Sequence, residues 1–138
     1  MTGIVVDSSV AASWILPDEA TEVAARWLEA AWTTPPVAPS HWPVEIANTA
    51  LQAHKRGRLK QVGLADAEAL LSGLAVEIEP AAPARVWRDG VALGQRHGLT
   101  VYDALYLEAA MRRGLVLATY DKALLRAASA EGVATQLR

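Results

Sequence analysis

The sequence of 138 residues contains no cysteine, which excludes a disulfide framework, a thiolate metal site and a cysteine nucleophile. No apolar run approaches the roughly 18 residues of a membrane span, and no basic segment or cleavage site of a signal peptide precedes the first apolar residues. The formal net charge is only −2, so no overall positive field attracts nucleic acid. We therefore expect a soluble, cytoplasmic protein in which any nucleic-acid site is local.

Apolar side chains are what the sequence has in quantity. Hydrophobic residues form 52% of the chain and charged residues 20%, which is ample material for a folded core. The length suits one domain of ordinary size, and no repeat, low-complexity tract or linker divides the sequence. We predict a single domain over residues 1–138.

Short apolar runs alternate with helical patterns along the chain. Uninterrupted runs at residues 3–6 and 115–118 predict strands buried on both faces of a parallel sheet. Residues 37–39 are predicted to be a short strand or an extended connector, and further strands are predicted at 76–80 and, as an edge strand, at 133–137. Helices are predicted at about 10–16, 19–32, 41–56, 65–76, 84–97, 102–113 and 121–131. The alternation of strand and helix predicts an α/β sandwich.

Two acids follow predicted strands. Asp7 comes directly after the 3–6 run, and Asp121 comes three residues after the 115–118 run. Ligand sites of parallel sheets lie beyond the carboxyl ends of the strands, so both carboxylates are expected at one edge of the sheet. For each acid alone, capping of the following helix is an equally good interpretation.

Asp103 lies on a helical face that is otherwise apolar. Helical spacing places it on the stripe of Tyr106, Leu107 and Ala110, which is expected to point inward. A buried carboxylate needs a cation, a metal or hydrogen-bond donors, because an unpaired buried charge is strongly destabilising. The alternative role is a cap on the helix that begins near Thr100.

Glu45 lies one turn into its predicted helix, with Asn48 three residues later on the same face. The two polar side chains can therefore contact the same ligand. Because Thr49 and Gln52 continue this face, a solvated polar stripe is the stronger interpretation for Glu45 taken alone. Only the ensemble of acids favours a functional role.

Four acids near helix N-termini at one edge of a sheet would raise one another's pKa by repulsion. A hard divalent cation would relieve this repulsion, and oxygen ligands without cysteine favour Mg²⁺ or Mn²⁺ over Zn²⁺. His41, His54 and His97 show no ligand spacing, so we interpret them as structural or surface groups.

Basic residues gather in two stretches, Lys55, Arg56, Arg58 and Lys60 in one and Arg112 and Arg113 in the other. Some of these charges can interact with the C-terminal carbonyls of helices. Beside a carboxylate-bound metal, however, they suit a polyanionic substrate whose phosphates they would position. Hydrolysis of a phosphodiester bond is therefore the chemistry we expect.

Four segments carry the acids and their neighbours. In chain order they are Val5-Val6-Asp7-Ser8-Ser9-Val10, Val44-Glu45-Ile46-Ala47-Asn48, Leu99-Thr100-Val101-Tyr102-Asp103-Ala104-Leu105-Tyr106 and Leu117-Ala118-Thr119-Tyr120-Asp121-Lys122-Ala123-Leu124. Each segment alone is a weak signal. In this order and spacing, across the whole chain, they resemble a PIN-domain ribonuclease and more narrowly a VapC-type toxin of a bacterial toxin–antitoxin pair.

The resemblance implies a three-layer α/β/α fold with a central, mostly parallel sheet and an endoribonuclease site dependent on one or two Mg²⁺ or Mn²⁺ ions. It also implies a homodimer, an RNA substrate contacted by the basic residues, and inhibition by a small cognate antitoxin. By position, the acidic quartet of the family falls on Asp7, Glu45, Asp103 and Asp121. By analogy Asp7 and Asp103 are the strongest ligands. Ser9 and Thr119 match the accompanying hydroxyl positions, and Asn48 matches the polar residue one turn after the glutamate.

The sequence leaves two other interpretations open. A phosphotransferase of the haloacid dehalogenase type also places an aspartate after its first strand, but it expects a second aspartate where this chain has Ser9. A catalytically silent PIN-like module, serving as an RNA-binding or protein-interaction scaffold, can carry the same acids in an inactive geometry. The chain lacks the second carboxylate that the phosphotransferase interpretation requires. Only a measurement of activity distinguishes the silent module from an active ribonuclease.

Overall fold

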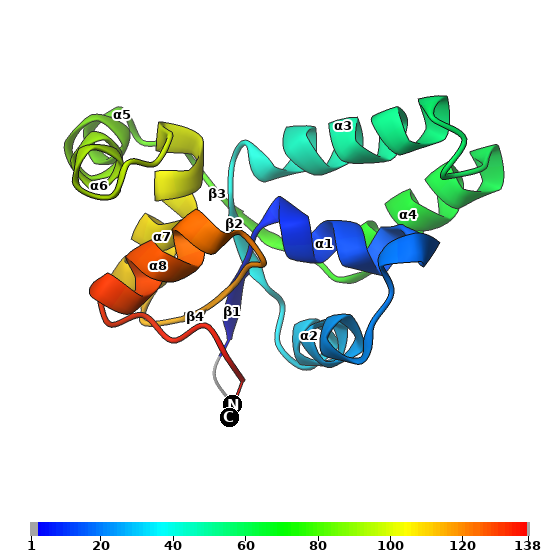
Figure 1. The fold of residues 1–138 in the computed structure, drawn as a ribbon, viewed down its shortest axis with the longest axis horizontal. Coiled ribbons are helices and arrows are strands. Elements are labelled where there is room, and N and C mark those ends of the chain that lie inside the picture. The colour runs from blue at the N-terminus through cyan, green and yellow to red at the C-terminus, as the bar shows by residue number, and fades with distance from the viewer. Residues whose placement is uncertain (1–2, 138) are drawn as a thin grey trace.

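The computed structural model describes residues 3–137 and shows a sheet of four parallel strands (Figure 1). The strands are β1 (Ile4–Val6), β2 (Val37–Pro39), β3 (Glu77–Glu79) and β4 (Val116–Ala118). Their order is β3-β2-β1-β4, with Val5 opposite Val37 on one side and Leu117 on the other. All four lie where the sequence predicts strands.

Helices follow each strand of the sheet. They are α1 (Ser8–Ile15), the 3-10 turn η1 (Pro17–Glu19), α2 (Glu22–Thr33), α3 (Trp42–Lys55), α4 (Gln61–Gly73), α5 (Pro83–Arg85), the π-helical turn η2 (Val86–Gly90), α6 (Val91–His97), α7 (Val101–Arg113) and α8 (Lys122–Ala130). In Figure 1, α1 to α4 lie on one side of the strands and α5 to α8 on the other. This confirms the predicted three-layer α/β/α fold.

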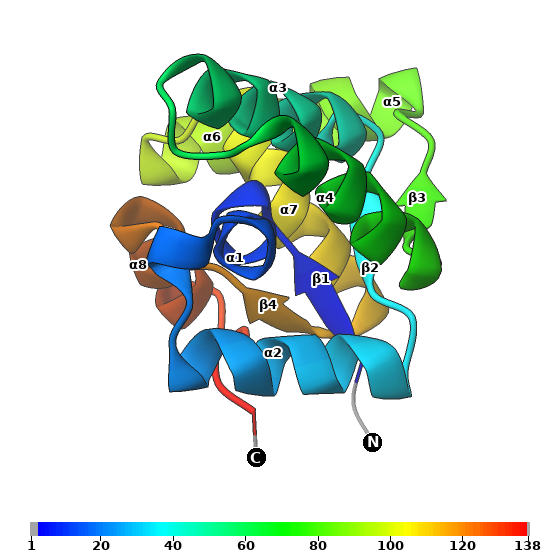
Figure 2. The same ribbon diagram turned by 90° about the vertical axis from the view of Figure 1, so that its right-hand side faces the viewer.

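Both faces of the central strands are covered, which explains why their sequences are apolar without alternation. The residues of β1 are at most 1% exposed, and α7 contacts β1, β2 and β4 across one face of the sheet. On the other face α1 packs against α2, α3 and α4. Figure 2 shows α1 nearer the viewer than β1, and α7 behind it.

The segment 133–137 forms no strand, so the prediction of an edge strand there is wrong. The Leu117 amide does donate a hydrogen bond to the Ala134 carbonyl at 2.9 Å. A strand needs a ladder of such bonds, and within the described residues the sheet consists of β1 to β4, with β1 as the paired neighbour of β4. Within residues 3–137, no helix combines the length and the apolar character needed to cross a membrane.

Strand β1 is the point at which the order of the sheet changes direction. The chain passes from β1 to β2 and β3 on one side, and β4 later returns to the other side of β1. The crevice beyond the carboxyl ends of strands at such a point is where open α/β sheets bind ligands. The carboxyl ends of β1, β2 and β4 are therefore the place to look for the predicted acids.

Candidate active site

Asp7 ends strand β1 and caps helix α1. Its Oδ1 accepts hydrogen bonds from the Ser9 amide (2.8 Å), the Ser9 hydroxyl (2.6 Å) and the Val10 amide (3.2 Å). Its Oδ2 accepts one from the Thr119 hydroxyl at 2.5 Å. Burial raises the pKa of Asp7, and these hydrogen bonds to the charged form act in the opposite direction. The carboxylate is thus both a helix cap and a fixed acid at the strand end.

Two hydroxyl groups tie the ends of β1 and β4 together. The Ser9 hydroxyl, which donates to Asp7, accepts a hydrogen bond from the Tyr120 amide at 2.9 Å. The Thr119 hydroxyl also donates to Asp7 and accepts from the Asp121 amide at 3.0 Å. The hydroxyl groups predicted beside the acids therefore hold the loop of Asp121 against Asp7.

Replacing Thr119 by valine is expected to lower the free energy of unfolding by about 1–3 kcal/mol. The substitution keeps the shape of the side chain but leaves a buried Asp7 oxygen without this donor and the Asp121 amide without this acceptor. Urea unfolding measures the loss, and Thr119→Ser, which retains the hydroxyl, is the matched control. Equal stability of the valine variant and the wild-type protein would contradict the bridging role.

Glu45 lies in the first turn of α3 and is hydrogen-bonded to α7. Tyr106, which is 1% exposed, donates its phenol hydrogen to the Glu45 Oε1 at 2.5 Å. Burial and this hydrogen bond raise the pKa of Tyr106, so the phenol stays protonated as a donor. One turn after Glu45, Asn48 is exposed and accepts a hydrogen bond from Gln52 at 3.5 Å. Glu45 is therefore fastened to the core, and the interpretation of a purely solvated stripe is wrong for this residue.

His41 lies beside Glu45, and its contacts agree with the structural role predicted for it. Its side chain is 15% exposed, and its Nε2 lies 3.5 Å from the Glu45 Oε1. Its ring packs edge-on against Tyr102 and Tyr106, with ring centroids 5.4 and 5.0 Å away. Burial lowers the pKa of His41, while the charges of Glu45 and Asp103 act to raise it.

The other two histidines have the structural role predicted for them. The Nδ1 of His54 lies 2.7 Å from the Leu59 carbonyl, which fixes the turn after α3. The Nε2 of His97 lies 2.6 Å from a Glu131 carboxylate oxygen and so links the end of α6 to the end of α8. Neither histidine contacts the acidic quartet through these bonds.

Asp103 lies in the first turn of α7, on the face that buries Tyr106 and Leu107. Burial raises the pKa of the Asp103 carboxyl, and the negative charges of Asp121 and Glu45 raise it further. Asp103 therefore lies within electrostatic reach of two of the other predicted acids, Asp121 and Glu45.

Thr100 and Asp121 provide the capping oxygens of α7 and α8. The Thr100 hydroxyl accepts a hydrogen bond from the Asp103 amide at 3.1 Å. The Asp121 Oδ1 accepts one from the Leu124 amide at 2.9 Å, which confirms the capping interpretation of this acid. Like Asp7, Asp121 combines this cap with a position at a strand end, so capping does not remove it from the site.

The four predicted acids thus lie at or near the starts of four helices that follow the carboxyl ends of the strands or pack on them. Within residues 3–137, however, no three His, Cys, Asp or Glu side chains are arranged so that they could together hold a metal ion. The feature that fits a hard cation is the donor chemistry, which consists of carboxylates and hydroxyl groups, with two carboxyl pKa values raised. Binding an ion would require these carboxylates to close around it.

Arg112 and Arg113 lie at the end of α7 opposite to Asp103. Arg112 forms an ion pair with Glu79 at 2.6 Å, and Arg113 forms ion pairs with Glu77 and Glu79. These acids belong to β3 and offset the charge of both arginines. The structure therefore does not bring this pair of predicted RNA contacts to the acidic quartet, and contact with RNA would require exchange of the ion pairs.

The other predicted RNA contacts lie between α3 and α4. Arg58 forms ion pairs with two acids of η1, at 2.8 and 2.9 Å. Lys55 and Arg56 are exposed at the end of α3, the helix whose first turn carries Glu45, and Lys60 is exposed just before α4. Contact of these residues with RNA stays a prediction.

Tyr106 is the functional residue that sequence reasoning missed. Its spacing from Asp103 correctly predicts a place on the inward face of the helix, but the pattern of the sequence shows this face only as apolar. The available signal was a phenol hydroxyl on a buried face, because such a group needs an acceptor. Its acceptor, Glu45, is 61 residues away in the sequence, so spacing alone could not identify it.

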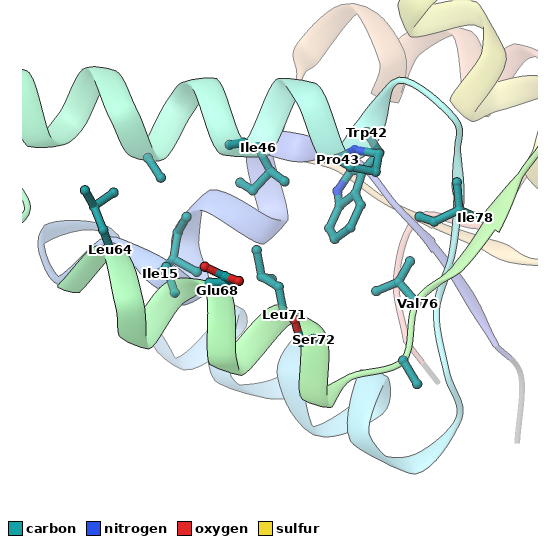
Figure 3. Close-up of a pocket in the computed structure, with 14 residues that line it drawn as sticks. Ile15, Trp42, Pro43, Ile46, Leu64, Glu68, Leu71, Ser72, Val76 and Ile78 are labelled. Atoms are coloured by element: carbon teal, nitrogen blue, oxygen red, sulfur yellow. The ribbon is translucent and has the colours of Figure 1, made fainter. Parts of the chain in front are cut away.

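A separate apolar cavity of about 670 Å³ lies between α3 and α4. Figure 3 shows Trp42, Ile46, Leu64 and Leu71 pointing into it from the two helices. Glu68 also lines the cavity, but none of the quartet does. Its lining suits apolar groups and not a phosphodiester, so we place the chemistry at the strand ends.

Comparison with known proteins agrees with this fold. The sequence profile of the PIN domain matches residues 4–130. The chain is 31% identical over 121 residues to Ribonuclease VapC3 of Pyrobaculum aerophilum, which covers 88% of this chain and 91% of that protein. The crystal structure of PAE2754 from Pyrobaculum aerophilum is similar in fold, with a TM-score of 0.66 and 22% identity over 91% of this chain and 79% of that chain. This chain belongs to the PIN-domain family, among the VapC-type ribonucleases.

Proposed function

We propose that this chain is a metal-dependent endoribonuclease, which hydrolyses RNA phosphodiester bonds and acts as the toxin of a toxin–antitoxin pair. The observation that carries the proposal is the gathering of Asp7, Glu45, Asp103 and Asp121 at the carboxyl edge of a PIN-domain sheet. The name of the VapC3 relative, a ribonuclease, supports the same chemistry.

The cofactor that these acids would hold is Mg²⁺ or Mn²⁺, as one or two ions per site. Oxygen donors without thiolates suit these hard cations, and a positive charge would relieve the repulsion that raises the pKa of Asp103. We expect Asp7 and Asp103 to be the strongest ligands, with Glu45 and Asp121 acting partly through water. When bound, such a cation makes water easier to deprotonate and neutralises charge on the phosphate oxygens.

The side chains around the acids keep them in place. Asp7 cannot rotate without breaking its bonds to Ser9 and Thr119, and the same hydroxyl groups hold the loop that carries Asp121. Tyr106 holds one oxygen of Glu45. These bonds restrict Asp7 and Glu45, so fewer groups have to be reordered when the site closes around an ion. Ser9, Thr119 and Tyr106 are therefore positioning residues in this proposal.

Replacing Tyr106 by phenylalanine is expected to lower kcat for RNA cleavage by about ten- to a hundredfold with little change in KM. The variant retains the buried ring but loses the hydrogen bond that fixes Glu45. Steady-state cleavage of a labelled RNA measures both constants. Thr33→Val, which removes a hydroxyl group on α2, is the control. Unchanged kcat in the Tyr106 variant would contradict its positioning role.

The remaining parts of the proposal concern partners. We infer a homodimer and a small cognate antitoxin from membership of the VapC-type group. We also expect a cytoplasmic protein, because RNA is its proposed substrate. Lys55, Arg56 and Lys60 are the predicted RNA contacts whose positions at the ends of α3 and α4 leave them exposed. They would hold the phosphates of a long substrate.

Induced expression in a bacterial host tests the toxin role together with the RNA chemistry. We expect wild-type protein to arrest growth and to produce new RNA 5′ ends at discrete positions, and Asp103→Asn to do neither at equal protein level. Growth arrest by both proteins, without new RNA ends, would contradict the proposal. It would favour the silent module that acts by binding.

A further inference from the structure

Two exposed tyrosines adjoin the acidic quartet. Tyr102 directly precedes Asp103 and is 63% exposed, and Tyr120 directly precedes Asp121 and is 38% exposed. Aromatic rings usually bury their apolar area, so rings left open to solvent beside an active site can bind a planar ligand. Two of the four acids, Asp103 and Asp121, are thus each preceded in the chain by an exposed tyrosine.

The ring of Tyr102 packs edge-on against the ring of His41, which also packs against Tyr106. Its centroid lies 5.4 Å from that of His41, with an angle of 72° between the ring planes. His41 makes the same kind of contact with Tyr106, at 5.0 Å and 71°, and Tyr106 is the donor to Glu45. This series of contacts connects the exposed ring of Tyr102 to the hydrogen bond between Tyr106 and Glu45. Tyr102 is therefore held in a defined place although most of it is exposed.

Tyr120 is held on the α1 side of the site. Its amide donates to the Ser9 hydroxyl at 2.9 Å, and its phenol oxygen lies 3.3 Å from the Ser13 hydroxyl oxygen. The same Ser9 hydroxyl donates to Asp7. Tyr102 and Tyr120 are thus anchored to different elements, one beside the start of α3 and the other beside the start of α1.

The charges of the protein provide little electrostatic attraction between RNA and this site. The acids repel phosphates, the net charge of the chain is −2, and several of its cations are already engaged with acids. The arginines in ion pairs are Arg58, Arg85, Arg88, Arg96, Arg112 and Arg113. Stacking of a base on an aromatic ring contributes about 1–3 kcal/mol per base and does not depend on charge.

We propose that Tyr102 and Tyr120 form a base-stacking subsite, on which unpaired nucleobases of the RNA next to the scissile phosphate lie. This inference rests on the proposed ribonuclease function and names its substrate class as single-stranded RNA. In a duplex the faces of the bases are already stacked, so the rings can bind them only where the RNA is unpaired. Because every base has a flat face, the subsite tolerates many sequences.

Binding in EDTA tests the subsite without cleavage. The probes are a single-stranded RNA of twelve nucleotides carrying 2-aminopurine, and a duplex of the same sequence. For the single strand we expect Tyr102→Ala to weaken binding by about five- to a hundredfold and to abolish the quenching of 2-aminopurine. Tyr102→Phe and Tyr102→Trp retain a ring and should bind like the wild-type protein, whereas Tyr102→Leu should not. We expect Tyr120→Ala to act in the same direction with a smaller effect.

Trp32→Ala is the matched control, because Trp32 is a 54% exposed aromatic residue on α2, and it should leave RNA binding unchanged. Equal binding by the wild-type protein, Tyr102→Ala and Tyr102→Leu would overturn the proposal, as would the absence of single-strand binding by the wild type. Loss of self-association in Tyr102→Ala with unchanged RNA affinity would assign the ring to a protein interface instead. RNA binding without cleavage on addition of Mn²⁺ would contradict only the ribonuclease function.

Discussion

Replacing Asp103 by asparagine is expected to lower RNA cleavage by at least about a hundredfold while leaving the protein folded. The substitution keeps the size of the side chain and removes the charge that Asp121 and Glu45 oppose. A neutral amide is a poor partner for a divalent cation and for the charges that develop during hydrolysis. Initial rates of cleavage of an end-labelled RNA measure the loss, with circular dichroism as the check of folding.

Asp89→Asn is the matched control for this variant. Asp89 lies in η2 and forms an ion pair with Arg88 at 3.0 Å, apart from the quartet. It should cleave RNA at the rate of the wild-type protein. Wild-type activity in Asp103→Asn would refute the assignment of Asp103.

The same two variants have opposite pH dependences of stability in EDTA. Burial and the neighbouring charges raise the pKa of Asp103, so its ionisation destabilises the folded state. The stability advantage of Asp103→Asn should therefore appear as the pH rises above about 4, the ordinary aspartate value, and level off above the raised pKa. Arg88 lowers the pKa of Asp89, so Asp89→Asn should lose stability relative to the wild type as the pH rises towards that ordinary value. Urea unfolding at a series of pH values compares the slopes, and a common sign would contradict the electrostatic account.

Removal of divalent metal is the second change with a large expected effect. EDTA should lower RNA cleavage by at least about a hundredfold, and Mn²⁺ should restore it. A cation that binds only the folded protein also stabilises it, by about 2.7 kcal/mol at a hundredfold excess over Kd. We therefore expect Mn²⁺ to raise the Tm of the wild-type protein but not that of Asp103→Asn.

The metal prediction depends on a rearrangement of the site. Within the described residues the carboxylates are not grouped closely enough to hold an ion, so binding must draw them together. Tyr106→Phe, which frees Glu45, should therefore retain a Mn²⁺-dependent rise of Tm even though its kcat falls. Full activity in EDTA, with no effect of Mn²⁺ on the Tm of the wild-type protein, would contradict metal dependence.

The strands could be predicted because a strand that is buried on both faces has a short run of apolar residues without polar alternation. The 3–6 and 115–118 runs contain no polar residue, and the structure pairs them as neighbours with Val6 opposite Ala118. The 133–137 segment contains Thr135 and Gln136 between apolar residues and forms no strand, because strand formation depends also on the partner that a segment finds. Composition predicts the ability to pair and not the pairing itself.

The acids were predictable for a related reason, and their partners were not. Asp7 and Asp121 follow strands that end at the same edge, so topology brings them together once the sheet is parallel. The hydrogen bond between Glu45 and Tyr106 depends on how the first turn of α3 meets α7, which no local pattern encodes. The sequence therefore identifies the carboxylates of the site, whereas the structure identifies the groups that hold them.

The basic residues were harder to interpret from the sequence than the acids. Clustering in the sequence suggested a surface for phosphates, but Arg58, Arg112 and Arg113 lie beside acids from distant segments. Opposite charges attract whatever their separation in the chain, so a basic stretch reveals a binding surface only when no acid folds against it. Lys55 and Arg56 stay candidates because they are exposed at the end of α3.

Cleavage of end-labelled RNA by purified protein tests the central claim most directly. Structured and unstructured RNAs are incubated with Mg²⁺ or Mn²⁺, beside EDTA and Asp103→Asn controls. The account predicts discrete internal cuts that disappear in both controls. Cuts that persist in EDTA and in Asp103→Asn, or no cut in any RNA by folded protein whose Tm responds to Mn²⁺, would contradict it.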